Sequence, residues 1–154
     1  MAVTLAGIST LGAQVGYAVG TTKPATFTEL ERCNSIGGIE LSTEQIDASA
    51  LIDKVSRYIA GRADTGGTWE LTFNLTDEVQ AILEGMLDAY EDRTSGQALW
   101  IEVTCPDLTD GFFVKAQPPA KIPMPEMSQN ALLTVTISFA IEEYVGLDTK
   151  VAFS

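Results

Sequence analysis

Pairs of carboxylates are the residues of this chain best suited to catalysis, because two neighbouring acidic side chains can divide the roles of acid, base and nucleophile. Such pairs occur at Glu29 and Glu31, at Asp77 and Glu78, and at Glu142 and Glu143. None of these pairs stands in a recognisable catalytic motif. A hydrolase that uses two carboxylates therefore remains the enzymatic alternative.

Other signs of chemistry are weaker. The sequence has no histidine, which removes the commonest general base and the commonest metal ligand. Asp107, Asp110 and Gly111 resemble part of an acidic metal loop, but the regular ligand spacing of a calcium loop is missing and a turn is favoured. The glycine pairs at 37–38 and 66–67 lack the lysine and hydroxyl residue of a phosphate-binding loop. We therefore expect no enzymatic activity, no cofactor and no bound metal.

The two cysteines, Cys33 and Cys105, lie far apart in the sequence and form no C-x-x-C motif. This spacing argues against a zinc site and allows at most one disulfide. Free thiols buried in strands are the favoured interpretation, and pairing of the two cysteines is the alternative.

Alternation of apolar and polar residues predicts most of the elements that would position these side chains. The clearest strand is at residues 67–75, where Trp69, Leu71 and Phe73 share one face. Further strands are expected at residues 12–20, 25–31, 98–104, 111–116 and 131–145, with a weaker one at 36–41. Prolines between the last two strands indicate a stiff connection. The pattern predicts a mainly β (α+β) fold.

One helix is predicted at about residues 77–92, because apolar residues recur there at helical spacing. Its packing face consists of Val79, Ile82, Leu83, Met86, Leu87 and Tyr90. Gly85 lies within this helix at a cost of about 1 kcal/mol relative to alanine, which suggests that a neighbouring backbone approaches closely there. The apolar face must pack against a sheet.

Residues 42–66 form a long polar connection without a period of its own. Unstructured connections longer than about 12–15 residues are uncommon in compact domains and tend to be functional or disordered. The segment is therefore either an arm that contacts a partner or a mobile surface insertion.

Length and charge limit the remaining possibilities. The 154 residues are enough for a single domain, and 21 acidic against 9 basic residues give a net charge of −12. Such a surface cannot hold nucleic acid by neutralising phosphates, so a DNA partner would be repelled and left free to slide. The alternative is that the acidity only keeps the protein soluble. We find no signal peptide and no apolar stretch of about 20 residues, so we expect synthesis in the cytoplasm and no membrane partner.

A family resemblance appears in residues 38–74, GIELSTEQIDASALIDKVSRYIAGRADTGGTWELTFN. A short strand is followed by an acidic, threonine-containing loop with an Asp-Ala-Ser segment. Arg57 and Tyr58 then precede Ile-Ala-Gly-Arg, a glycine turn and an alternating strand. In this order the segment resembles the major tail tube proteins of long-tailed bacteriophages, which are similar to type VI secretion tubes. The resemblance extends through the helix and the strand-rich C-terminal part.

The resemblance implies a single domain over residues 1–154 with two packed antiparallel sheets, as a β-sandwich or barrel, and one flanking helix. Copies of the chain would form hexameric rings that stack into the tail tube of a virion and conduct double-stranded DNA during ejection. The expected partners are copies of the chain itself and the tape measure, tail tip and terminator proteins. DNA would pass transiently and without sequence specificity.

The resemblance also assigns roles to residues. The loop at residues 42–66 would reach a neighbouring ring through Asp47, Asp53, Lys54, Arg57, Tyr58 and Arg62. Alternation places Glu70 and Glu102 opposite the apolar core, where they are candidates for the lumen or an interface and equally for plain solvated positions. The alternative function is a monomeric virion decoration or ligand-binding β-domain.

Overall fold

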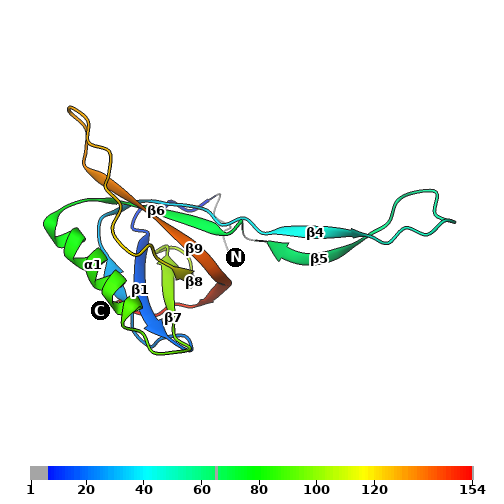
Figure 1. Cartoon of the computed structure of the whole chain (residues 1–154), viewed down its shortest axis with the longest axis horizontal. Helices are drawn as coiled ribbons and strands as arrows, with labels where there is room; N and C mark the ends of the chain where they lie inside the picture. The colour runs from blue at the N-terminus through cyan, green and yellow to red at the C-terminus, as the bar shows by residue number, and fades with distance from the viewer. Residues whose placement is uncertain (1–6, 65, 154) are drawn as a thin grey trace, which may run out of the picture.

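The computed structural model describes residues 7–64 and 66–153, and it confirms the mainly β class with antiparallel sheets and a helix (Figure 1). One sheet has seven strands in the order β2-β1-β7-β8-β9-β6-β3. Their bounds are β1 Gln14–Gly20, β2 Thr28–Leu30, β3 Cys33–Ile36, β6 Thr68–Asn74, β7 Ala98–Thr104, β8 Asp110–Gln117 and β9 Thr134–Thr149. The second sheet pairs β4 (Ser42–Asp47) with β5 (Tyr58–Asp64). The helix α1 covers Asp77–Glu91.

The two halves of the curled seven-stranded sheet share β9 (Figure 1). The first part of β9 pairs with β6, from Thr134 to Ala140, and the second part pairs with β8, from Ala140 to Thr149. Register shifts interrupt the β8–β9 pairing at two places, and such bulges increase the local bend and twist of a strand. The sheets do not close into a barrel.

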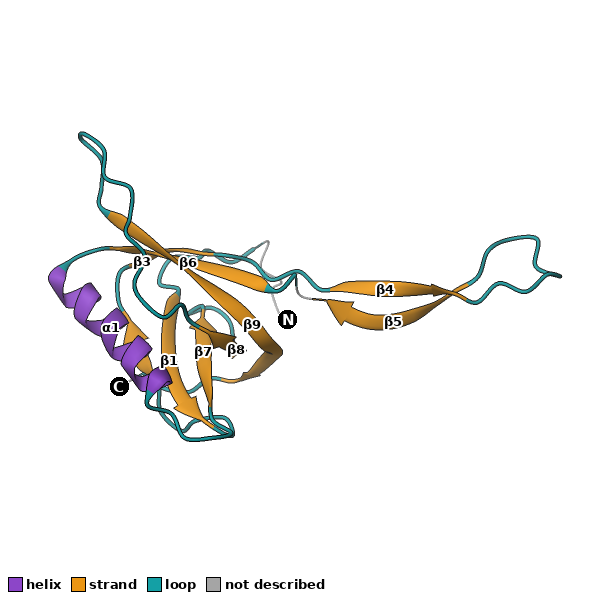
Figure 2. Cartoon of the chain, in the orientation of Figure 1, coloured by secondary structure: helices purple, strands orange, loops and turns teal. Residues whose placement is uncertain are grey.

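The main core fills the concave side of this curled sheet and is capped by α1 (Figure 2). Alternating residues of β6 and β9 meet there in register, with Trp69 opposite Phe139 and Leu71 opposite Ile137. The Trp69 and Phe139 rings lie 5.9 Å apart between centroids. The alternation that predicts these strands therefore marks the core side directly.

Thr76 caps α1, because its hydroxyl accepts a hydrogen bond from the amide of Val79 at 3.3 Å. The packing residues form two groups: Val79, Leu83 and Met86 are buried, while Ile82, Leu87 and Tyr90 are partly buried against the core. The expectation of a close backbone at Gly85 is wrong. A methyl group there would have the Tyr17 hydroxyl as its nearest neighbour, at 3.6 Å, which is ordinary van der Waals contact.

A second, smaller cluster lies on the convex face of the sheet, where Phe27, Trp100 and Phe113 are buried. Residues 150–153, here called the C-terminal strap, cover this cluster with Val151 and Phe153. Phe153 forms an isolated parallel bridge with Phe27. The strap therefore turns part of the convex face into a buried layer.

Two expectations about local structure need correction. Residues 42–66 are not an irregular connection, because most of them form the β4–β5 hairpin. This hairpin projects away from the body instead of packing against the larger sheet (Figure 1). The weak strand expected at residues 36–41 is instead β3, which ends at Ile36 where Gly37 and Gly38 follow.

Candidate assembly surfaces

The projecting hairpin, here called the arm, comprises residues 42–64. Every residue of β4 is exposed, and β5 is exposed except for Gly61. Ile46 and Ile59 face each other across the hairpin and are 46% and 55% exposed. The arm therefore has two solvated faces, and an isolated two-stranded hairpin of this kind is at best marginally stable in water.

Side-chain hydrogen bonds organise the arm tip, residues 48–57. An oxygen of Asp47 accepts from the amide of Ser49 at 2.9 Å, which lowers the pKa of Asp47. Asp53 accepts from the amide of Ala50 at 2.8 Å and forms an ion pair with Arg57 at 3.3 Å. Asp47 and Asp53 thus hold the tip in one shape, in addition to any contact they make with a neighbour.

The other predicted arm residues point into solvent. Tyr58 is 57% exposed, and Lys54 and Arg62 are also exposed. Within the part of the chain that the structure describes, neither Lys54 nor Arg62 has a carboxylate within ion-pair distance. Their charges are therefore available to a partner.

Sequence reasoning missed the apolar residues of the arm tip. Leu51 is fully exposed, Ile52 is 90% exposed and Val55 is 78% exposed. Three apolar side chains at the end of a long polar arm are unusual, because nothing in the arm gives them a core to join. The available signal was their clustering within an otherwise polar segment.

Glu70 lies on the convex face of β6 and is exposed, as alternation predicts. Its carboxylate accepts a hydrogen bond from the Ser138 hydroxyl at 3.3 Å, and the Thr72 and Thr136 hydroxyls lie 3.0 Å apart on the same face. This part of the sheet is a polar surface of small hydroxyl residues with one carboxylate.

Glu102 was expected on an open face, and this expectation is wrong. Its side chain is 0% exposed, because the C-terminal strap crosses the convex face of β7. One carboxyl oxygen accepts from the Val151 amide at 2.8 Å, and the other has no partner among the described residues. Burial raises the pKa of Glu102, while the Val151 hydrogen bond and the nearby Lys23 and Lys150 lower it. Glu102 cannot line a lumen while the strap is in place.

An apolar groove opens at the edge of the main core. It has two connected parts of about 680 Å³ and 320 Å³, which share Ile36, Val103 and Phe112. These shared residues are only half-buried, so the concave core remains accessible there. Both free cysteines, Cys33 and Cys105, line the larger part. The groove is a second surface that sequence reasoning missed.

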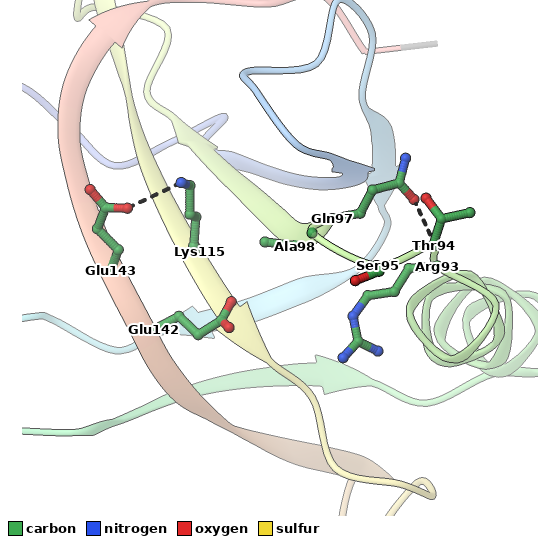
Figure 3. Close-up of a pocket in the computed structure, with 9 residues that line it drawn as sticks. Arg93, Thr94, Ser95, Gln97, Ala98, Lys115, Glu142 and Glu143 are labelled. Carbon is green, nitrogen blue, oxygen red and sulfur yellow. Dashed lines mark hydrogen bonds and ion pairs between the residues drawn. The ribbon is translucent and has the colours of Figure 1, made fainter.

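A polar hollow of about 660 Å³ lies between the turn after α1 and the outer sides of β8 and β9 (Figure 3). Lys115 forms an ion pair with Glu143 at 3.1 Å, and Glu142 accepts from Gln117 at 3.2 Å. The Arg93 guanidinium stacks over the Tyr90 ring at 3.8 Å. Both carboxylates of the hollow are thus engaged, Glu142 by Gln117 and Glu143 by Lys115.

The described residues contain no group of three or more side chains suited to holding a metal ion. Burial raises the pKa of the Cys33 thiol to about 11, so this cysteine is a poor nucleophile at neutral pH. No helix in the described part of the chain has the length and apolarity needed to cross a bilayer. The notable features of the surface are thus the arm, the polar convex face and the groove.

No protein-family model matches the chain, and no curated protein sequence matches it. Several chains of solved structures share its fold, including the two that follow. A chain from the cryo-EM structure of the sheath/tube terminator of an extracellular contractile injection system, in the extended state, superposes with a TM-score of 0.68 at 12% identity. The match covers 94% of this chain and 99% of that one.

The second is a chain from the six-fold symmetrised baseplate of the anti-feeding prophage, with a TM-score of 0.52 at 13% identity. This match covers 97% of this chain and 99% of that one. At such low identity the likeness establishes a common fold and leaves function to be argued from surfaces. The chain therefore has, over nearly its full length, the fold of components of phage-like injection particles.

Proposed function

We propose that this chain is a structural subunit of a phage-like tail, and that copies of it assemble into stacked rings that form the tail tube. The fold that it shares with parts of injection particles supports this role, as does the resemblance of residues 38–74 to tail tube proteins. A non-enzymatic role is supported by the neighbours in fold, which are parts of a sheath/tube terminator and a baseplate structure.

The observation that carries the proposal is the arm. A polar hairpin that exposes Leu51, Ile52 and Val55 at its end is costly to keep in water, and the body of the same chain offers it no cover (Figure 1). An arm of this kind gains stability when a neighbouring subunit covers it. In a stack of rings, each subunit has a neighbour at a fixed distance that could cover the arm.

The charge of the chain suits a conduit. Each copy carries a net charge of −12, so a ring of six copies would be strongly negative as a whole. If the polar convex face with Glu70 and the Thr72–Thr136 pair lines the lumen, it presents hydroxyls and a carboxylate to DNA. Such a wall would not bind phosphates, and double-stranded DNA could slide.

A second candidate is a terminator, which would close a tube with one ring instead of forming the tube. The extensive match to a chain of a sheath/tube terminator structure favours it. The two functions differ in how many rings assemble. Tube subunits stack without limit, whereas a terminator gives single rings that bind only to the end of a tube.

Size-exclusion chromatography and negative-stain electron microscopy over rising protein concentrations test both candidates. Striated tubes support the tube subunit, isolated rings support the terminator, and a persistent monomer rejects both in favour of a decoration or ligand-binding domain. Arg62→Glu reverses an exposed charge of β5 and should reduce ring stacking while leaving the monomer folded. Unimpaired stacking would exclude Arg62 from the contact.

A further inference from the structure

We propose that the arm tip of one copy seats Leu51, Ile52 and Val55 in the apolar groove of a second copy. This inference rests on the proposed self-assembly and identifies the two surfaces that would make the contact. The tip donates apolar side chains, and the groove receives them.

The lining of the groove suits the binding of apolar side chains. None of the described residues that line either part is charged, although the chain carries 30 charged side chains in 154 residues, 21 acidic and 9 basic. Phe112, Val103 and Tyr144 present half-buried faces to it because the curled sheet does not close. Cavities of this size and lining are typical of sites that bind apolar groups.

The tip is held ready for such a contact. The ion pair of Asp53 with Arg57 and the hydrogen bond from Ser49 to Asp47 fix the loop between the two strands. Because the loop is already ordered, less conformational entropy is lost when the apolar side chains are buried. The tip is therefore preorganised for binding.

The arm tip and the groove of one copy would contact two different neighbouring copies. Ile39 lines the groove and the arm begins at Ser42, so the groove lies at the base of the arm. The loop between β4 and β5 lies at the far end of the arm (Figure 2). Because the tip lies far from the groove of its own copy, it can fill only the groove of another copy. Donor and acceptor surfaces that differ give a head-to-tail contact, which builds closed rings or open stacks.

Charge favours the arm tip over the other exposed apolar segment. The tip, residues 48–57, carries the cations Lys54 and Arg57 and only one carboxylate. Next to groove residue Leu108 lie Asp107, which is exposed, and Asp110, while the nearby Lys150 donates to the carbonyl of Cys105 at 2.8 Å.

The rival segment is the connection between β8 and β9, residues 118–133, here called the second projection. It exposes Met124 and Met127 and balances Lys121 against Glu126. With two cations against one carboxylate, the arm tip therefore complements the acidic side of the groove better than the second projection does.

Disulfide trapping in the full chain tests the contact, because the groove already contains free cysteines. Ile52→Cys places a thiol on the tip, and Met124→Cys places one at an equally exposed position of the second projection, 90% against 89%. Assembled protein is oxidised with copper phenanthroline, and the linked peptides are identified by mass spectrometry. Cys105 is the expected acceptor, because Cys33 has a pKa of about 11 and reacts slowly.

The expected result is an intermolecular disulfide between the tip of Ile52→Cys and Cys105 or Cys33, lost when both groove cysteines are replaced by serine. Met124→Cys should form no such link. Rings or tubes in which the tip links elsewhere, or in which Met124→Cys fills the groove, would overturn the inference and leave the proposed function intact. A chain that stays monomeric at every concentration would overturn both.

Discussion

The backbone amide of Val151 donates a hydrogen bond to a carboxyl oxygen of Glu102 at 2.8 Å, inside a layer from which solvent is excluded. Room for the carboxyl comes from Gly111 on β8, where an added methyl group would stand 3.1 Å from the bonded oxygen. The strap thus closes over an ionisable group that its strand pattern would place in water. A buried carboxylate with one unpaired oxygen is a local cost to the fold.

Glu102→Gln should therefore stabilise the folded chain at pH 7. The pKa of Glu102 is higher in the folded chain than in the unfolded chain, so the folded chain binds the proton more tightly. Glu102 therefore lowers the free energy of unfolding increasingly as the pH rises from the unfolded pKa through the folded pKa. The gain should shrink as pH falls towards the ordinary glutamate range near 4.3. Thermal melts at pH 7 and pH 4 measure it, with the exposed Glu70→Gln as control. An equal gain at both values would contradict the pKa argument.

Gly16→Ala should destabilise the chain by displacing the strap. A methyl group on Gly16 would collide with the Phe153 ring and would stand 3.0 Å from the Thr28 carbonyl oxygen. Phe153→Ala alone should cost about 1–3 kcal/mol, less than the ~3–5 kcal/mol of a fully buried phenylalanine, because Phe153 is half-buried. Urea denaturation of both single variants and the double variant measures the coupling. The double variant should cost less than the sum, and strict additivity would separate Gly16 from the strap.

Some of this structure follows from the sequence because one face of a strand is buried. In β6 the alternation of Trp69, Leu71 and Phe73 with polar residues marks the core side, and the strand forms within the predicted residues 67–75. β9 begins and ends a few residues later than the predicted residues 131–145. The arm has no buried face, so Ile46 and Ile59 produce no readable alternation and the hairpin is missed.

The error at Glu102 has a different origin. Alternation tells which side of a sheet a residue occupies, but it does not tell what covers that side. The cover at Glu102 is the strap, which lies 49 residues away from it in the sequence. The groove could not be predicted from the sequence for the same reason. Its lining comes from segments that are far apart in the chain, residues 8–13, 33–39 and 103–114.

Gly85→Ala should stabilise α1. The nearest atom to an added methyl group is the Tyr17 hydroxyl at 3.6 Å, so the methyl fits without displacement. Alanine then gains the helix propensity that glycine lacks, about 1 kcal/mol. Chemical denaturation measures the gain, and Ala81→Gly on the exposed side of the same helix should lose a similar amount. A loss of stability in Gly85→Ala would mean that the helix packs more tightly on β1 than this geometry gives.

Cys33 should react slowly with alkylating reagents while the chain is folded. Desolvation raises its pKa to about 11 from an ordinary 9.0, so at pH 8 the reactive thiolate is about a hundredfold scarcer than in the unfolded chain. The rate of iodoacetamide labelling in a Cys105→Ser background measures this, with and without denaturant. Labelling of the folded chain at the unfolded rate would show that the thiol is not desolvated.

Replacing the apolar residues of the arm tip should separate folding from assembly. Leu51→Ser, Ile52→Ser and Val55→Ser together remove side chains that are almost fully exposed, so the monomer should keep its stability within about 0.5 kcal/mol. Burial of each such side chain in a partner contributes about 1.5–3 kcal/mol, so their joint loss should raise the concentration needed for rings by orders of magnitude. Sedimentation velocity over a concentration series measures this onset.

The matched control is Met124→Ser with Met127→Ser, which removes exposed apolar groups from the second projection. If the arm tip drives assembly, the control should form rings at nearly the same concentration as the unchanged chain, because exposed methionines on a segment that contacts no neighbour contribute nothing to association. If the control variant instead needs a higher concentration to form rings and the tip variant does not, the second projection makes the contact. The polar tip variant would then show that the arm serves another purpose than joining copies of the chain.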